Sequence, residues 1–254
     1  MRTARRPLLA FAAALLTGSR RARAHATSGM LSPGTRFSTP WFRLDGGEPG
    51  PTVAIVAGIH GNETAPPVAA DLLTRSAVRR GALWIVPEAN RPALAAASRF
   101  TPGARLSNMN RNFPTDPDSA PRGDMAPALW RALLSIEPTW VLDLHEGWGF
   151  SASSQSMGSS VVCAGPAGVE TRVNDDGEAM ATRVLDAANG VVAEPHKRFT
   201  LLRPGPRGSL ARAAAEHAAI RALVFETTWT QPQPLRVAQQ LLMVRAVLKA
   251  LDMV

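Results

Sequence analysis

The chain has 254 residues, of which 45% are hydrophobic, so it is long enough for one large α/β domain or at most two small ones. Its formal charge of +8 would suit a polyanion, but residues 1–26 contain six arginines and no acidic residue. Removing those six charges from +8 leaves +2, and we therefore expect no nucleic acid as a partner. A single cysteine, Cys163, excludes an internal disulfide and lies in an apolar stretch, where it acts as a small hydrophobe.

The first 26 residues have the pattern of an export signal. A basic start precedes a short apolar stretch from Pro7 to Leu16, and small-x-small cleavage sites follow at residues 22–24 and 24–26. The apolar stretch is too short for a permanent membrane anchor, and Arg5-Arg6 is close to a twin-arginine signal. We expect an export signal at residues 1–26, one domain at residues 27–254, and a periplasmic or secreted location. An amphipathic N-terminal helix is the alternative.

Strand and helix patterns alternate after this segment. Residues 36–44 predict an edge strand or hairpin interrupted by Pro40. A turn then leads into a buried aliphatic strand at 53–57. A helix over 66–79 and a strand over 82–86 follow. Residues 88–127 show no sustained periodicity, which is typical of an ordered functional loop region with one short helical turn near 92–98.

The second half of the chain continues the alternation. Its predicted elements are a helix over 127–136, a strand over 139–145, a mobile Gly/Ser-rich loop over 147–160, a strand over 160–164, a helix over 176–188, a loop over 201–209, a helix capped by Ser209, a strand over 220–226 and a helix over 235–251 that buries Leu241, Leu242, Val244 and Leu248. This order predicts the α/β class, with a mixed, largely parallel central sheet and helices on both faces.

Polar side chains follow three of these strands. His60 and Glu63 come just after the first buried strand, His145 ends the strand over 139–145, and Glu226 ends the strand over 220–226. In open α/β sheets, ligands bind where parallel strands end. An imidazole and a carboxylate suit zinc, and a catalytic zinc site needs a third protein ligand and one open position.

Three motifs occur in order before Glu226. They are Gly-Ile-His-Gly-Asn-Glu at 58–63, Asn-Arg-Asn-Phe-Pro at 110–114 and Asp-Leu-His-Glu-Gly at 143–147. With them, the chain resembles the zinc carboxypeptidase superfamily, which includes the succinylglutamate desuccinylase/aspartoacylase branch. The resemblance extends from about Thr52 to Leu251.

The resemblance implies a role for each matching residue. One zinc ion per chain would be bound by His60, Glu63 and His145, with water in the open position. Asn110 and Arg111 would hold the carboxylate of the substrate, and Glu226 would be the general base and acid. The alternatives are a surface salt bridge for Arg111 and a loop-capping carboxylate for Glu226.

This chain also departs from the family pattern. The family has a further arginine before the Asn-Arg pair to polarise the scissile carbonyl, and Arg91, Arg99 and Arg105 are candidates, with Arg99 favoured by its spacing and by the Phe that follows it. There is no tyrosine, so the mobile tyrosine of digestive carboxypeptidases is absent, and Arg203 or Arg207 is a candidate to reach the substrate instead. Desuccinylases and aspartoacylases usually carry a second, C-terminal domain, whereas we expect a catalytic domain alone.

Two acidic neighbours of His145 have different expected roles. Asp143 lies on the same strand face as His145, so it either orients this ligand or is structural. Glu146 follows His145 directly and should point to the opposite face.

The resulting hypothesis is an exported zinc hydrolase that cleaves an amide bond near a free carboxylate, in a small molecule or short peptide. Carboxypeptidase and N-acyl-amino-acid deacylase activities both remain open. Gly-Asn-Glu after His60 favours the deacylase, whereas Asn-Arg-Asn-Phe-Pro and the export signal favour the peptidase. The alternatives are a non-catalytic zinc- or peptide-binding module of the same fold and a protein tethered to the membrane by an uncleaved N-terminal segment. No stable membrane insertion is expected after cleavage.

Overall fold

A single eight-stranded sheet organises residues 25–165 and 171–254, which are the residues that the computed structural model describes. The strands are β1 (His25–Leu31), β2 (Thr39–Asp45), β3 (Glu48–Ala57), β4 (Arg80–Val86), β5 (Trp140–Gly147), β6 (Ser160–Cys163), β7 (Thr200–Leu202) and β8 (Arg221–Thr228). Their order in the sheet is β1-β2-β4-β3-β5-β8-β6-β7. The central strands β4, β3, β5 and β8 are parallel, as are β6 and β7, and the other pairs are antiparallel. The predicted mixed α/β sheet is confirmed.

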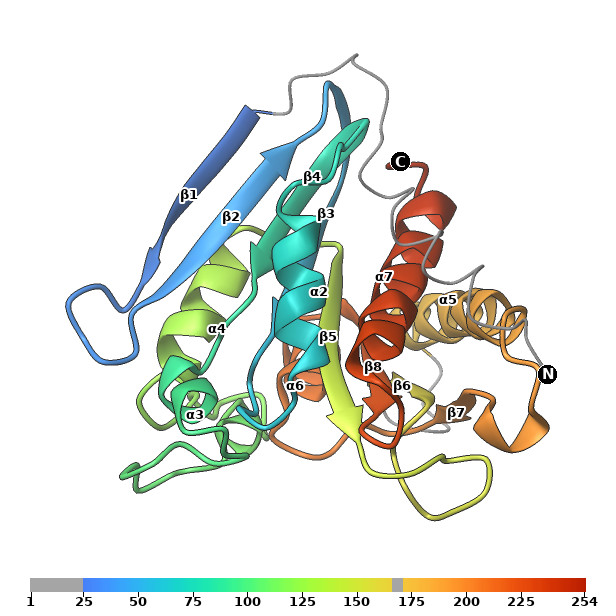
Figure 1. Cartoon of the computed structure of the whole chain (residues 1–254). Coiled ribbons are helices and arrows are strands. Elements are labelled where there is room, and N and C mark those ends of the chain that lie inside the picture. The colour runs from blue at the N-terminus through green and yellow to red at the C-terminus, as the bar shows by residue number, and fades with distance from the viewer. Residues whose placement is uncertain (1–24, 166–170) are drawn as a thin grey trace.

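Helices cover both faces of the sheet, as predicted (Figure 1). One face carries α2 (Ala65–Leu73), α5 (Arg172–Asn189) and α7 (Gln233–Ala250), and the other carries α4 (Ala126–Ser135) and α6 (Leu210–His217). Side chains of the central strands alternate between two apolar cores, because successive residues of a strand point to opposite faces. On β5, Val141 belongs to the core under α4 and α6, whereas Leu142 belongs to the core under α2 and α7.

The short elements lie in the connections between these helices and strands. They are α3 (Arg91–Ala95) and two 3₁₀ turns, η1 (Met109–Arg111) and η2 (Pro195–Lys197). The helical turn predicted near residues 92–98 is therefore present as α3. Cys163 is buried, as expected for a small hydrophobe.

The end of one helix and the place of one strand in the sheet differ from the sequence expectations. Helix α2 ends at Leu73 instead of residue 79, because the N–H groups of Thr74, Arg75 and Ser76 bond to carbonyls three residues back and close the helix. Strand β2 is not an edge strand, because it lies between β1 and β4. It instead forms an antiparallel hairpin with β1, which was the other expectation for this segment. Pro40 is tolerated there since pairing with β4 begins only at Phe42.

Most of the predicted export signal lies outside the described residues. Strand β1 begins at His25, within the last two residues of the expected signal segment. In the part of the chain that the structure describes, none of the helices combines the length and apolar character needed to cross a membrane.

Candidate active site

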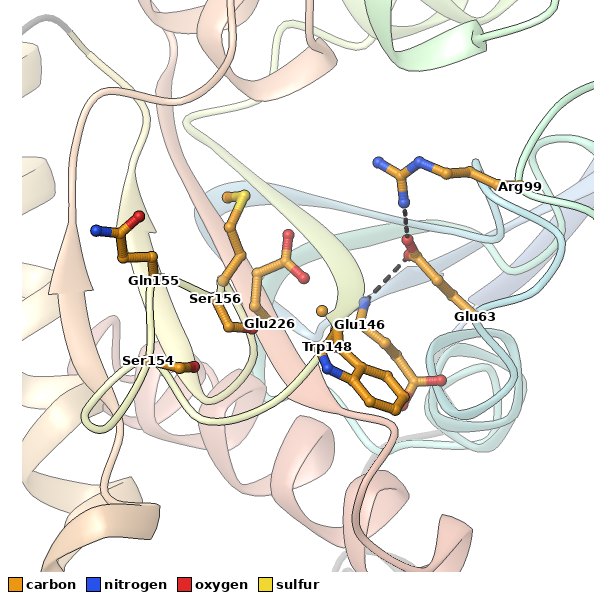
Figure 2. A pocket seen from close by; sticks show the side chains of 10 residues that line it. Glu63, Arg99, Glu146, Trp148, Ser154, Gln155, Ser156 and Glu226 are labelled. Carbon is orange, nitrogen blue, oxygen red and sulfur yellow. Dashed lines mark hydrogen bonds and ion pairs between the residues drawn. The ribbon is translucent and has the colours of Figure 1, made fainter.

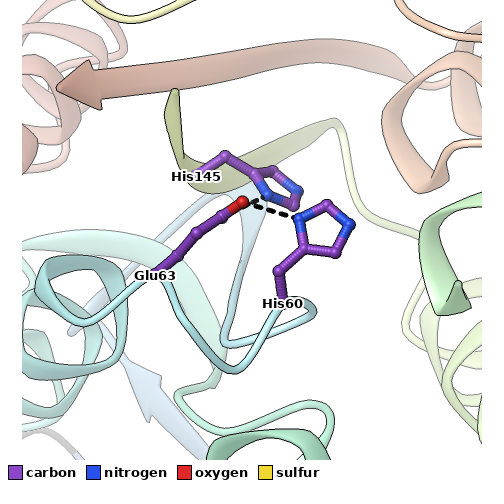
Figure 3. A group of neighbouring side chains, drawn as sticks. All are labelled: His60, Glu63 and His145. Carbon is purple, nitrogen blue, oxygen red and sulfur yellow. Dashed lines mark hydrogen bonds and ion pairs between the residues drawn. The ribbon is translucent and has the colours of Figure 1, made fainter. Parts of the chain in front are cut away.

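Three buried side chains converge at the carboxyl end of the sheet (Figure 3). His60 and Glu63 come from the turn between β3 and α2, and His145 comes from β5. Glu63 Oε1 lies 2.7 Å from His60 Nδ1, and Glu63 Oε2 lies 2.8 Å from His145 Nδ1. One atom of each residue lies within 4.8 Å of the others, so a single ion could contact all three.

Glycine allows the ligand-bearing turn to form. Gly58 has φ +72°, a conformation that other residues rarely adopt. A Cβ on Gly61 would lie 1.9 Å from the carbonyl oxygen of Ala93, so only glycine lets this turn pack against α3. The Gly61 N–H also donates to the carbonyl of Ser98 at 2.8 Å. These contacts set the direction in which His60 leaves the turn.

The remaining ring nitrogens of both histidines have polar neighbours. His60 Nε2 is 3.3 Å from Asn108 Oδ1, and His145 Nε2 is 3.1 Å from Asp143 Oδ1. Metal-binding histidines usually donate their other ring N–H to a carboxylate or a carbonyl oxygen, which fixes the ring. The structure therefore supports the orienting role of Asp143, and it adds Asn108, which sequence reasoning missed.

The charges of this cluster suit a cation. Burial alone would raise the pKa of Glu63, but His145 and His60 outweigh it and lower this pKa to about 2, so the carboxylate stays ionised. Burial opposes charge on His145, yet Asp143 and Glu63 raise the pKa of this imidazole well above its usual value. Carboxylates that stabilise a positive imidazole would also stabilise a divalent ion. Burial lowers the pKa of His60, which favours the neutral form that binds metals.

Two imidazoles and one carboxylate are a common ligand set of catalytic zinc. The residues present therefore fit a zinc ion held by His60, Glu63 and His145.

Glu226 lies beside this cluster on β8, where it is the register partner of His145. Its carboxylate is buried, and its Oε2 has no hydrogen-bond partner among the described residues. Burial raises the pKa of Glu226 to about 8, with His145 opposing the shift and Glu63 adding to it. A carboxyl group that titrates near neutral pH is suited to general acid–base catalysis.

A pocket of about 490 Å³ opens in front of Glu63 and Glu226 (Figure 2). Its lining residues are Glu63, Arg99, Glu146, Gly147, Trp148, Ser154, Gln155, Ser156, Met157 and Glu226. Arg99 lies on one wall, and the segment after β5 forms the opposite wall. Glu63 of the metal cluster, the candidate base Glu226 and Arg99 thus share one cavity.

Of the three candidate arginines, only Arg99 lies in this pocket. Its Nη1 is 3.1 Å from Glu63 Oε1. Arg91 instead contacts the carbonyl of Ser38 and the carboxylate of Glu88 at the surface. Arg105 is exposed and does not line the pocket. Polarisation of the carbonyl by Arg99 stays a prediction, because Arg99 is paired with Glu63 here.

Asn110 contributes to the fold around the cluster. Its Oδ1 accepts from the N–H of Leu210 at the start of α6, and its Nδ2 lies 3.2 Å from His145 Nε2. The Oδ1 atom of the amide is thus engaged within the protein, whereas Nδ2 keeps at least one N–H that could donate to a carboxylate. The contact of Asn110 with the substrate carboxylate stays a prediction.

Arg111 is solvent-exposed next to Asn110 and donates to the Asn110 carbonyl at 2.5 Å. Burial, followed by repulsion from Arg99, lowers the pKa of Arg111, but a guanidinium keeps its charge in proteins. No carboxylate among the described residues forms an ion pair with Arg111, so the surface salt bridge considered for it is not present. Its role as the carboxylate anchor remains a prediction.

We expect Arg111→Lys to raise KM for a carboxylate-bearing substrate about tenfold or more while stability changes little. Lysine keeps the charge but cannot bind two carboxylate oxygens through a planar fork. Steady-state kinetics together with the melting temperature would test this. Unchanged KM would show that the anchor lies elsewhere.

The candidates proposed to replace the absent tyrosine lie outside the pocket. Arg203 pairs with Glu178, and Arg207 pairs with Asp116. Neither arginine lines the cavity.

Glu146 directs its side chain away from His145, as predicted, and there it joins a buried network. Its carboxylate accepts from Arg236 Nη1 at 2.5 Å, from Thr227 Oγ1 at 3.1 Å and from the N–H of Ala65 at 2.9 Å. The network links β5, β8, α7 and the start of α2, and so supports both ligand-bearing segments from behind. Sequence reasoning missed Arg236, whose only signal is a charge in a helix that is otherwise largely buried.

We expect Arg236→Met to reduce the free energy of unfolding by about 3–5 kcal/mol, because it leaves the Glu146 carboxylate buried without a counter-charge. Urea unfolding would measure the loss. The double variant Glu146→Leu/Arg236→Met should recover much of it, since no buried charge then remains unpaired. A loss below about 1 kcal/mol in the single variant would contradict this account.

Residues 49–171 match the model of the succinylglutamate desuccinylase/aspartoacylase catalytic domain. This part of the chain is therefore similar to the catalytic domain of that family. The matched segment contains His60, Glu63, Asn110, Arg111 and His145, so the resemblance noted from the motifs is confirmed, and Glu226 lies beyond the match.

Individual relatives agree with this assignment. Over 101 residues the chain is 37% identical to N-alpha-acetyl-L-2,4-diaminobutyric acid deacetylase of Halomonas elongata, a region that is 39% of this chain and 29% of that protein. A succinylglutamate desuccinylase from Silicibacter sp. TM1040 has a similar fold, with a TM-score of 0.67 and 20% identity over 90% of this chain and 68% of the other.

The tripeptide-bound cell shape determinant Csd4 from Helicobacter pylori also has a similar fold, with a TM-score of 0.63 and 20% identity over 81% of this chain. The chain spans 52% of the length of Csd4. At 20% identity these structural similarities establish only the fold. This chain has the α/β fold of the succinylglutamate desuccinylase family members.

Proposed function

We propose that this protein is a zinc-dependent deacylase that hydrolyses the amide bond of N-acyl amino acids. The observation that carries the proposal is the placement of Glu226, with its unbonded carboxylate oxygen, in the same pocket as Glu63 of the metal cluster. The family match and the named deacetylase relative support a deacylase over a carboxypeptidase.

The three residues of the metal cluster, together with Glu226 and Arg99, each have a task in this reaction. Zinc, when bound by His60, Glu63 and His145, polarises a carbonyl and supplies a nucleophilic water at neutral pH. Glu226 accepts a proton from the attacking water and delivers it to the leaving nitrogen, which needs a carboxyl group that titrates near neutral pH. Arg99 lies where it can donate to the developing oxyanion.

The free carboxylate of the amino acid would bind on the arginine side of the site. Arg111 does not line the pocket, but it follows Asn110, whose Nδ2 lies 3.2 Å from His145 Nε2, so its backbone lies next to the metal cluster. A planar guanidinium can bind both oxygens of a carboxylate. The proposed substrate is thus a small molecule with one free carboxylate next to the scissile amide.

A matched substrate panel tests the proposal. The purified protein, stripped with a chelator and then reloaded with one equivalent of zinc, would be incubated with N-acyl amino acids, dipeptides and peptidoglycan peptides. We expect release of free amino acids from the N-acyl compounds only after zinc is restored. Cleavage of the peptides alone would establish a carboxypeptidase, and bound zinc without any turnover would establish a binding module.

We also propose that the protein is exported to the periplasm or secreted. The support is the sequence of residues 1–26, with its arginines, short apolar stretch and small-residue cleavage sites. N-terminal sequencing of exported material should give a chain that starts near residue 27. An intact Met1 would favour the tethered alternative.

A further inference from the structure

The pocket has two walls of different character. The segment from Gly147 to Ser159, called here the acyl loop, contributes Trp148, Ser154, Gln155, Ser156 and Met157 to one wall. The acyl loop contains no acidic residue, no basic residue and no histidine in its sequence. The opposite wall carries Arg99, which is the only cation among the lining residues. Figure 2 shows the two walls facing each other across Glu226.

The acyl loop is held in place by close backbone contacts at its base. A Cβ on Gly147 would lie 2.4 Å from the amide nitrogen of Gly158, so these two segments touch through their backbones. The Ser151 N–H donates to the carbonyl of Gly158 at 2.7 Å, and Ser160 Oγ donates to the carbonyl of Met157 at 2.6 Å. The wall is therefore largely formed before a substrate arrives, which is the condition for selective binding.

Charge complementarity orients a substrate between these walls. The free carboxylate of the amino acid is attracted to the side of Arg99 and Arg111, and the group on the other side of the scissile amide then faces the acyl loop. That group is the acyl chain. Its neighbours there are hydroxyls, an amide, a thioether and the indole of Trp148, which is 69% exposed at the rim.

Among the described residues that line the pocket, a second carboxylate on the acyl chain would have no counter-charge beside the acyl loop. It would lie against uncharged side chains and close to the carboxyl groups of Glu63 and Glu226 in the same pocket. Placing like charges next to each other disfavours binding, whereas a methyl or short alkyl group meets no such repulsion. We propose that the acyl loop forms a subsite for short uncharged acyl groups, so that the protein prefers N-acetyl over N-succinyl amino acids. This inference rests on the proposed function.

The test compares kcat/KM of the zinc-loaded protein for the N-acetyl and N-succinyl derivatives of one amino acid. We expect the acetyl derivative to be favoured at least about tenfold. Preference for the succinyl derivative would overturn the subsite and leave the deacylase function standing. Hydrolysis of neither derivative by the zinc-loaded protein would overturn both.

A charge introduced into the wall provides a second arm. Gln155→Arg places a guanidinium on the acyl loop and should shift the ratio of kcat/KM towards the succinyl derivative by about tenfold, the effect of one favourable charged hydrogen bond. Ser153→Arg adds the same charge to the same loop at an exposed residue that does not line the pocket, and should leave the ratio unchanged. Equal shifts in both variants would overturn the subsite. If Gln155→Arg does not fold, the substrate ratio of the unmodified protein decides.

Discussion

Replacing Glu226 by glutamine should lower kcat by about 10²–10⁴-fold, the usual contribution of general acid–base catalysis. Glutamine keeps the shape of the side chain but cannot accept a proton from water. Zinc content should stay at one ion per chain, because Glu226 is outside the cluster of His60, Glu63 and His145. Near-normal turnover with zinc retained would reject the role, and loss of zinc would place Glu226 among the ligands.

We also expect Glu226→Gln to change the stability of the metal-free protein in a way that depends on pH. Burial in the folded protein raises the pKa of Glu226 from 4.5 to about 8, so the folded state favours the protonated form. The stability that this group contributes is fully present below pH 4.5 and is lost as the pH rises through about 8. Glu226→Gln should therefore be more stable than the unmodified protein at pH 9.

The difference in stability between Glu226→Gln and the unmodified protein should become smaller as the pH is lowered. At pH 4 the carboxyl group is protonated in the folded protein, and the two proteins should unfold at similar denaturant concentrations. Chemical denaturation of chelator-treated protein at both pH values measures the difference. A variant that is less stable than the unmodified protein at pH 9 would contradict the burial of an uncompensated carboxylate.

His145→Ala should weaken zinc binding by more than about 10²-fold, since loss of a group that merely orients a ligand already costs about 10–100-fold. His60→Ala should behave in the same way. Both variants remove one of three donors that converge on a single point. Competition with a chromophoric chelator measures the zinc Kd independently of activity.

Asp143→Asn is the matched comparison for these two variants. It keeps His145 but removes the carboxylate 3.1 Å from His145 Nε2, so the loss should lie within the smaller range of about 10–100-fold. Stoichiometric tight zinc in His145→Ala would disprove the ligand assignment. A loss in Asp143→Asn as large as in His145→Ala would show that Asp143 does more than orient the ring.

The sequence alone located the candidate metal cluster of His60, Glu63 and His145 for a physical reason. Parallel strands in one sheet end at the same edge, so polar residues placed just after buried aliphatic runs are brought together whatever the details of packing. The runs before His60, His145 and Glu226 were visible in the sequence, and the motifs identified the family. Ser209 could likewise be predicted as a helix cap, because a cap depends only on residues within one turn of the chain.

Tertiary structure decided the features that depend on distant partners. The sequence favoured Arg99 over Arg91 and Arg105 by its spacing, and the tertiary structure shows that, of these three, only Arg99 lines the pocket. The burial that shifts the pKa of Glu226 depends on the packing around β8, which no local pattern reports. Arg236 lies 90 residues from Glu146, and its role became visible only when α7 packed against β5 and β8. Periodicity along the chain predicts which face of a strand is apolar, but the pairing of charges across the fold requires the coordinates.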